Sequence, residues 1–197
     1  MILIILGLTG SIGAGKSTLA KMLRRLDCPI SSSDNIVAAL YQEKDIQLKI
    51  AENLPKNFGE ITQYKVSQFI VKNPDFLKNL EKIIHPEVEK RHLWDIDQAK
   101  SEKKSIIVLE IPLLFELHWQ NKCDKVLLVT CQHDIQYHRV MARKGMTENK
   151  FATLWARQWP EAQKQKLADF ILDTSYGRLH TFQQLRRLLE LHCLNKN

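Results

Sequence analysis

The sequence has no hydrophobic run long enough to cross a lipid bilayer. Its longest apolar stretch spans Met1 to Leu8, whereas a membrane-spanning helix needs ~20 apolar residues. This stretch also lacks the basic flank and the small-residue cleavage site of a signal peptide. We therefore expect neither a membrane protein nor a secreted one, and no membrane partner.

Cysteine is scarce as well, and its spacing follows no known motif. Cys28, Cys123, Cys131 and Cys193 form no C-x-x-C pair. This spacing gives no support for a zinc site or a thioredoxin-like motif, and it argues against a disulfide scaffold. Reduced thiols suit a reducing compartment, so a cytoplasmic protein is expected.

Acidic residues are outnumbered by basic ones. The chain has 22 Asp and Glu against 29 Lys and Arg, which gives a net charge of +7 at pH 7. A basic surface indicates an anionic partner, which could be nucleic acid, an acidic membrane face or a phosphorylated small molecule. Charge alone does not choose among these partners.

The order of apolar segments predicts the fold class. The 197 residues are 44% hydrophobic and 26% charged, which is typical of a globular domain with insertions. Short apolar segments with the pattern of buried parallel strands alternate with amphipathic helical patterns. This alternation predicts a three-layer α/β fold with right-handed connections. The strands are expected at residues 1–8, 28–31, 105–111, 125–130 and 170–172, and the helices at about 17–26, 134–143, 147–157 and 182–192.

A long polar segment interrupts this alternation. From Asp34 to about Lys104 the pattern is helical, with no convincing strand. Phe76, Leu80 and Ile84 share one helical face, and Pro86 should bend or break that helix. The segment is predicted to be a helical insertion between strands of the sheet.

Glycine is also rare, but it is concentrated at one place. The chain has 7 glycines, about half of the ~7% average, and four of them lie between Gly7 and Gly15. Residues 10–17 read GSIGAGKS, which matches the phosphate-loop pattern G-x-x-x-x-G-K-[ST] after an apolar strand and before an amphipathic helix.

Each part of this pattern has a chemical role. Glycines let successive N–H groups turn inward around phosphate oxygens, and the helix adds its partially positive N-terminus. Lys16 can reach the β- and γ-phosphates, and the Ser17 hydroxyl can ligate Mg²⁺. The sequence therefore predicts a nucleoside triphosphate with Mg²⁺ at this loop.

Three classes of phosphate-loop protein compete: a small-molecule kinase, a GTP switch and an ATPase acting on nucleic acid. Asn121–Asp124 spells the guanine-reading N-K-x-D, but it precedes an apolar strand instead of following one, and no D-x-x-G occurs in the chain. The nucleic-acid interpretation rests on charge without an aromatic stacking platform. We expect no nucleic-acid partner, because a triphosphate and a second phosphorylated substrate would use the same charge.

Several segments resemble the dephospho-coenzyme A kinase family. Residues 7–18 read GLTGSIGAGKST and are similar to the family's opening GLTGGIGSGKST. The phosphate loop is generic, but His85-Pro86 and residues 111–116 (IPLLFE), in the same order and at suitable spacing, make the resemblance specific. The resemblance also includes Asp34, Arg139 with Arg143, Gln158 and residues 168–173 (ADFILD).

The resemblance implies ATP-dependent phosphorylation of the ribose 3′-hydroxyl of dephospho-coenzyme A, which gives coenzyme A and ADP in the last step of coenzyme A biosynthesis. Another phosphate-loop nucleoside or nucleotide kinase is the alternative. A monomer or a weak homo-oligomer is expected. The implied parts are a P-loop NTPase-type core at residues 1–35, 105–134 and 168–197, a substrate-binding helical insertion at 36–104 and a helical lid at 135–167.

Two carboxylates are candidates for the reaction centre. Asp34 follows the second strand, where a carboxylate can accept the proton of an attacking hydroxyl. Its position alone equally allows a helix N-cap, and the resemblance favours the base. Glu110 ends a strand, where it could bind Mg²⁺ directly or through water. For Glu116 we prefer a salt bridge.

Arg139 and Arg143 are four residues apart, so they should project from one helix face. A mobile lid could bring both guanidinium groups over the phosphates as charge develops.

The motif and the resemblance together assign roles to the site residues. Catalysis is assigned to Asp34, Lys16 and Arg143, and ATP binding to Gly13, Ala14, Gly15, Lys16, Ser17, Thr18, Arg139 and Gln158. Substrate binding is assigned to Thr9, Asp34 and His85, and metal binding to Ser17 and Glu110.

The chain departs from the family pattern at three positions. Ser32 stands where many members have Asp, Ala38 where they have Arg, and Thr174 where they have Asn. These changes leave one substrate contact and the adenine-side contacts open. They do not remove Lys16 or Asp34, so we expect an active enzyme.

Overall fold

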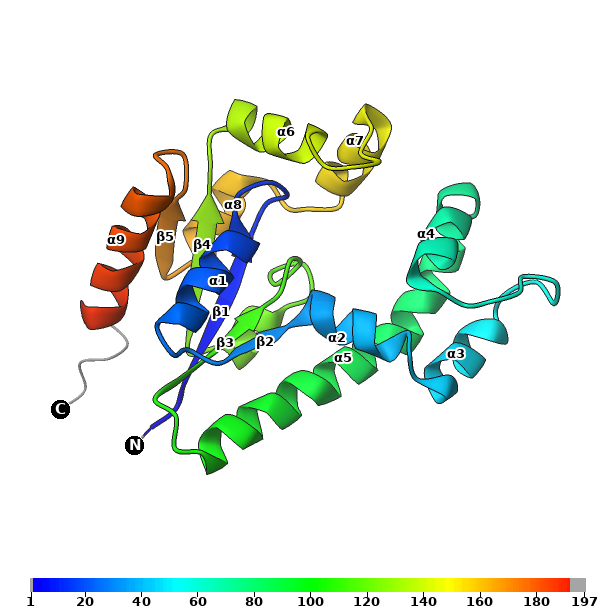
Figure 1. The fold of residues 1–197 in the computed structure, drawn as a ribbon, viewed down its shortest axis with the longest axis horizontal. Coiled ribbons are helices and arrows are strands. Elements are labelled where there is room, and N and C mark those ends of the chain that lie inside the picture. The colour runs from blue at the N-terminus through cyan, green and yellow to red at the C-terminus, as the bar shows by residue number, and fades with distance from the viewer. Residues whose placement is uncertain (1, 192–197) are drawn as a thin grey trace. The chain divides into compact units, whose positions relative to one another are not determined.

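The computed structural model describes residues 2–191 (Figure 1). The chain divides into two compact units, and each is described by itself. The first contains the residues up to Ser31 and those from Ile96 onward, and the second contains Ser32–Asp95.

The first unit is built on a five-stranded sheet with the order β2-β3-β1-β4-β5 (Figure 1). β1 pairs in parallel with both β3 and β4, and β4 pairs in parallel with β5. Leu8 lies opposite Glu110 on one side and Leu127 on the other. The strands are β1 (Ile4–Gly10), β2 (Ile30–Ser32), β3 (Ile106–Glu110), β4 (Lys125–Thr130) and β5 (Phe170–Asp173).

Alternation along the strands divides the core of this unit into two layers. Leu6 and Leu8 pack with residues of α1 (Lys16–Arg25) and α9 (Arg178–Leu189). Ile5 packs against a second cluster that contains Ile96, Phe115 and Trp119. Because successive side chains of a strand point to opposite faces, the sheet is covered on both sides, which confirms the predicted three-layer α/β fold. The remaining helices of this unit are η1 (Trp119–Lys122), α6 (His133–Met141), α7 (Glu148–Ala156) and α8 (Glu161–Leu167).

The second unit is helical, as its polar 3.6-residue pattern predicted. It contains α2 (Ser33–Leu40), α3 (Lys44–Ala51), α4 (Gln63–Lys72) and most of α5 (Phe76–Ser101). Its core is a cluster of aliphatic and aromatic side chains. Phe69, which packs against this cluster, makes edge-to-face contacts with Phe58 and Phe76, at ring-centroid distances of 5.5 and 5.2 Å. The members are Leu40, Tyr41, Ile46, Ile50, Leu54, Val66, Phe76, Leu80 and Ile84.

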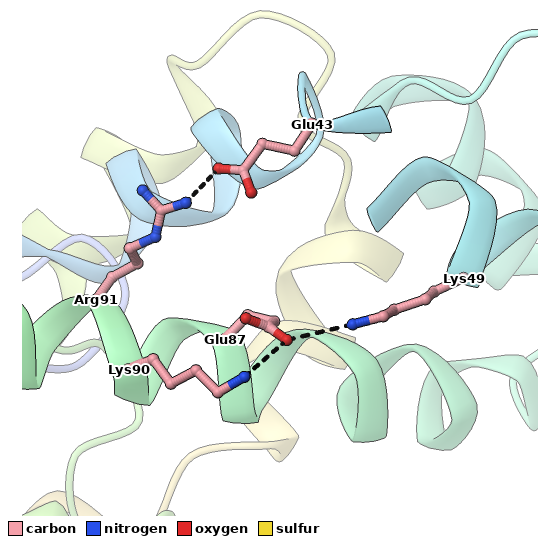
Figure 2. A network of polar contacts seen from close by, with 5 residues as sticks. All are labelled: Glu43, Lys49, Glu87, Lys90 and Arg91. Atoms are coloured by element: carbon pink, nitrogen blue, oxygen red, sulfur yellow. Dashed lines mark hydrogen bonds and ion pairs between the residues drawn. The ribbon is translucent and has the colours of Figure 1, made fainter. Parts of the chain in front are cut away.

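Ion pairs join α5 to α3 and to the turn before α3 (Figure 2). Arg91 Nη2 lies 2.6 Å from Glu43 Oε1, and Glu87 Oε1 lies 3.2 Å from Lys90 Nζ and 3.4 Å from Lys49 Nζ. The hydrogen bond from Lys90 is the largest of the contacts that hold the pKa of Glu87 below its usual range. These pairs are open to solvent, so each contributes less than about 1 kcal/mol, and the apolar cluster supplies most of the stability.

The structure differs from the sequence-based expectation at two helices. Pro86 was expected to bend or break its helix, but α5 continues through it, so a break is wrong. The proline ring is exposed while Leu80 and Ile84 of the preceding turns are buried in the core, so packing offsets the lost hydrogen bond.

Helix α8 was not predicted, because its only buried residue is Lys164 and it has no apolar stripe. In the described part of the chain, no helix is long and apolar enough to cross a membrane.

Candidate active site

The glycine loop connects β1 to α1. Gly13 and Gly15 have φ angles of 81° and 100°, a region that side chains with a Cβ rarely adopt. A Cβ on Gly13 would also lie 2.7 Å from the carbonyl oxygen of Gln136. The Ala14 N–H donates to the Ser11 carbonyl at 3.0 Å and closes the turn. Both backbone conformation and packing therefore require glycine at position 13.

The start of α1 faces this loop with positive groups. The first N–H groups of a helix have no intrahelical acceptor, and in α1 they belong to Lys16 and Ser17. The first turn contains no acidic residue, Lys16 is half-buried and Ser17 is exposed. Together with the helix dipole, these groups give the start of α1 the positive character that favours a bound anion.

Arg139 and Thr174 hold the carbonyl side of the loop. Arg139 Nη1 donates to Thr174 Oγ1 at 2.9 Å and to the Gly13 carbonyl at 3.4 Å. The buried Thr174 hydroxyl donates in turn to the Ala14 carbonyl at 2.6 Å. The residue that departs from the family's Asn thus binds the loop backbone. No sequence pattern signals this contact, because the bonded residues are far apart in the chain.

The opposite side of the loop is held by the segment that leads into α8. Gln158 Oε1 accepts the Ile12 N–H at 2.9 Å, and the fully buried Lys164 donates to Ser11 Oγ at 3.2 Å. Glu116 Oε1 lies 3.8 Å from Lys164 Nζ, which confirms the predicted salt bridge. Burial lowers the pKa of Lys164, and the nearby carboxylates oppose this shift.

Glu110 and Thr9 lie at the carboxyl edge of the sheet. Glu110 is the last residue of β3 and is 5% exposed. Thr9 is buried, and its hydroxyl donates to the Pro112 carbonyl at 3.3 Å. Ser17 and Glu110 supply hard oxygen donors of the kind that Mg²⁺ takes. Among residues 2–191, no group of three or more His, Cys, Asp or Glu side chains could hold a metal ion. The donor set therefore fits a metal that arrives with phosphate oxygens better than a permanently bound one.

In the second unit, Asp34 lies in the first turn of α2 with an exposed side chain. The N-cap of α2 is Ser32, so the alternative that Asp34 is itself the cap is wrong. Ser33, which lies between Ser32 and Asp34, shares a 2.9 Å hydrogen bond with the buried His92 of α5. Burial lowers the pKa of His92 to about 4, so the ring is neutral at physiological pH. His85 is exposed on the same helix.

The predicted alignment of Arg139 and Arg143 on one helix face is wrong. α6 ends at Met141, and Arg143 follows in an exposed turn. The next helix, α7, buries no residue, and aromatic rings join it to α6. Tyr137 and Phe151 have ring centroids 5.6 Å apart, and His133 and Trp155 have theirs 5.2 Å apart. An element with so little buried surface is well suited to local movement.

The chain is similar to known proteins along nearly its whole length. A sequence model described as dephospho-CoA kinase matches residues 4–179. A dephospho-CoA kinase of Agrobacterium fabrum is 37% identical over 190 residues, which cover 95% of this chain and 97% of that protein. One from Mesorhizobium japonicum is 41% identical over 177 residues, covering 89% of each.

Solved structures share the fold of this chain. TT1252 from Thermus thermophilus has a TM-score of 0.82 at 30% identity, covering 98% of this chain and 99% of that one. The dephospho-CoA kinase from Campylobacter jejuni has a TM-score of 0.72 at 23% identity and covers 98% of each chain. A shikimate kinase from Acinetobacter baumannii, with a TM-score of 0.55 at 17% identity over 98% of this chain and 96% of its own, shares the fold alone. The glycine loop, the parallel sheet that carries it and these matches together show that the chain belongs to the dephospho-CoA kinase family of phosphate-loop kinases.

Proposed function

We propose that this kinase transfers the γ-phosphoryl group of ATP to the ribose 3′-hydroxyl of dephospho-coenzyme A, giving coenzyme A and ADP. The observation that carries the proposal is the anion-binding loop between β1 and α1 in a chain that matches dephospho-CoA kinases over residues 4–179. Shikimate kinases have related folds, so the fold alone does not indicate which molecule accepts the phosphoryl group. The match to the dephospho-CoA kinase family supports dephospho-coenzyme A as the acceptor.

The loop is proposed to bind the phosphates of ATP. Among residues 13–18, the N–H groups of Gly13, Gly15, Lys16 and Ser17 would surround the phosphate oxygens, and the Lys16 ammonium would lie beside the β- and γ-phosphates. Ser17 and Glu110 would hold Mg²⁺, which supplies charge neutralisation on the phosphates when it is bound. Arg139 and Gln158 serve the same site through the loop atoms that they bond.

Asp34 is proposed as the base for the acceptor hydroxyl. Its carboxylate is exposed in the first turn of α2, where it is accessible to a substrate, and hydroxyl orientation by such a group is typical of phosphoryl transfer. The helical unit that contains Asp34 and His85 is the proposed binding region for dephospho-coenzyme A. Thr9 is the weakest candidate for a substrate contact, because its hydroxyl is buried and already bonded.

Arg143 is proposed to stabilise the charge that develops during transfer. It lies in the exposed turn between α6 and α7, within the proposed lid at residues 135–167. Movement of this turn together with α7, which buries no residue, would bring a guanidinium to the phosphates while excluding water.

We also propose that the protein is cytoplasmic and a monomer or weak homo-oligomer. Within the described part of the chain, Cys28, Cys123 and Cys131 form no disulfide, as a reducing compartment favours. Cys193 lies outside the described residues.

A product assay tests the proposal. ADP release would be measured with dephospho-coenzyme A, nucleosides and nucleoside monophosphates as acceptors, and the products would be identified by mass spectrometry. Coenzyme A formation with the first acceptor alone is the expected result. Efficient turnover of a nucleoside or a nucleotide, with none of dephospho-coenzyme A, would support the alternative kinase activity.

A further inference from the structure

We propose that Lys164 is a positioning residue for the phosphate loop: its buried ammonium, paired with Glu116, fixes Ser11 and keeps the loop in the shape that binds ATP. The proposal rests on ATP binding by this loop.

Lys164 is an unusual anchor for a helix. It is 0% exposed and is the buried residue of α8, although lysine is almost never fully buried unless it is paired. A short helix normally packs through an apolar side chain, and Ala162 and Leu167 of α8 are exposed instead. The local fold thus brings a cation, not a hydrophobic group, to the back of the loop.

The contacts of Lys164 are directed at the loop. Its Nζ donates to Ser11 Oγ at 3.2 Å and lies 3.8 Å from Glu116 Oε1. Ser11 is 6% exposed, and its carbonyl accepts the Ala14 N–H that closes the loop. A side chain that fixes Ser11 therefore also fixes the turn that contains Gly13.

The segment before α8 also holds Ile12, the loop residue next to Ser11, through a second hydrogen bond. The Trp159 N–H donates to Glu116 Oε1 at 2.7 Å, and Gln158 accepts the Ile12 N–H at 2.9 Å. Loss of the Lys164 charge would disturb Glu116, and through Glu116 the backbone that positions Gln158. Ser11 and Ile12 are thus both dependent on the Lys164–Glu116 pair.

The charges around Lys164 are balanced for an anion-binding loop. Burial lowers the pKa of the ammonium, and the nearby Lys16 lowers it further, while Glu116 and Glu161 raise it. Without Lys164, the half-buried carboxyl groups of Glu116 and Glu161 would remain near a loop that binds phosphate. The expected consequence is weaker ATP binding through both altered geometry and unfavourable charge.

Lys164→Met tests this role, with Lys166→Met as the matched control. Both lysines lie on α8, but Lys166 is exposed. Calorimetric titration with magnesium ATP should show about a tenfold or larger increase in the dissociation constant for Lys164→Met. At saturating ATP the kcat of this variant should fall. Its KM for dephospho-coenzyme A should stay within about twofold of the KM of the unmodified protein, because the lost charge-assisted bond lies at the ATP site alone. Lys166→Met should match the unmodified protein in every measurement.

Two further variants keep the proposal testable if Lys164→Met is poorly folded. Ser11→Ala removes the loop hydroxyl and leaves the Lys164–Glu116 pair in place, and it should weaken ATP binding with little change in melting temperature. The pair Lys164→Met and Glu116→Gln should lose no more ATP affinity than Lys164→Met alone, because the two residues act as one unit.

Unchanged ATP affinity in folded Lys164→Met, or in Ser11→Ala, would overturn the positioning role. Failure of the proposed function is distinguishable, because the unmodified protein would then release no heat with magnesium ATP, or would bind it without phosphorylating dephospho-coenzyme A.

Discussion

The glycine loop and the first turn of α2 both carry proposed catalytic residues, but they are held differently. The loop is bonded on two sides by buried or half-buried side chains from α6, α8 and the adjoining segments. Asp34 instead projects from an exposed helix start that a Ser33–His92 hydrogen bond ties to α5. The loop is thus fixed in place by polar contacts, whereas α2 presents the Asp34 carboxylate to solvent.

This contrast predicts that changes at Asp34 and changes in the loop will affect different quantities. Asp34→Asn should lower kcat by roughly 10²–10⁴-fold, because the side chain can no longer accept the hydroxyl proton. The dissociation constant of magnesium ATP and the melting temperature should remain unchanged. Steady-state kinetics and calorimetry measure the three quantities.

Asp45→Asn is the matched control for Asp34→Asn. Asp45 is also an exposed aspartate in the first turn of a helix of the same unit. If the two variants had equal kcat values, Asp34 would not be the base.

In the loop, Gly13→Ala should reduce stability and ATP binding together. A left-handed φ costs a residue with a Cβ roughly 1–2 kcal/mol, and the Cβ would also lie 2.7 Å from Gln136 O. Gly59 has a φ of 79°, and a Cβ added there would meet no other part of the described chain within 4 Å, so Gly59→Ala isolates the backbone cost. Chemical denaturation should show a clearly larger loss for Gly13→Ala, and equal losses would mean that the loop is not packed as described.

The stability of the second unit should depend on pH through His92. Its pKa is about 4 in the folded protein against about 6.5 for the unperturbed group, a difference of roughly 3 kcal/mol. The unfolded chain binds the proton more tightly, so this stability is fully present above pH ~6.5 and decreases as the pH falls toward 4.

Denaturation curves recorded between pH 7 and pH 4 measure this loss. In His92→Gln, which keeps a polar side chain but does not titrate, the slope of stability against pH should be smaller. An identical slope in both proteins would show that the buried imidazole does not control the acid response.

The smallest predicted effect concerns the hydroxyl that holds the loop backbone. Thr174→Val removes the bond to the Ala14 carbonyl and the acceptor for Arg139, which should cost about 1 kcal/mol and weaken ATP binding several-fold. Thr181 is also buried, and its hydroxyl donates to the Gly177 carbonyl at the start of α9. Thr181→Val should therefore lose similar stability but bind ATP normally. If both variants bound ATP equally well, Thr174 would have no special role at the loop.

Local patterns explain which features could be predicted from the sequence. The apolar run of β1 and the 3.6-residue pattern of α1 are written in neighbouring residues, and the loop motif between them is contiguous. The supports of the loop are not local: Gln158 bonds Ile12, and Lys164 bonds Ser11, across most of the chain. Nothing in the sequence around Lys164 marks it as buried, since α8 lacks an apolar face. Only the packed structure brings such residues together.

The most direct test of the account is whether the loop amides bind the phosphates. Amide resonances of isotopically labelled protein would be followed by NMR during titration with magnesium ATP. The largest shifts are expected at Gly13, Gly15, Lys16 and Ser17, with much smaller changes when adenosine replaces ATP. If these amides stayed unshifted while the folded protein bound ATP, the phosphates would lie elsewhere and the central claim would be contradicted.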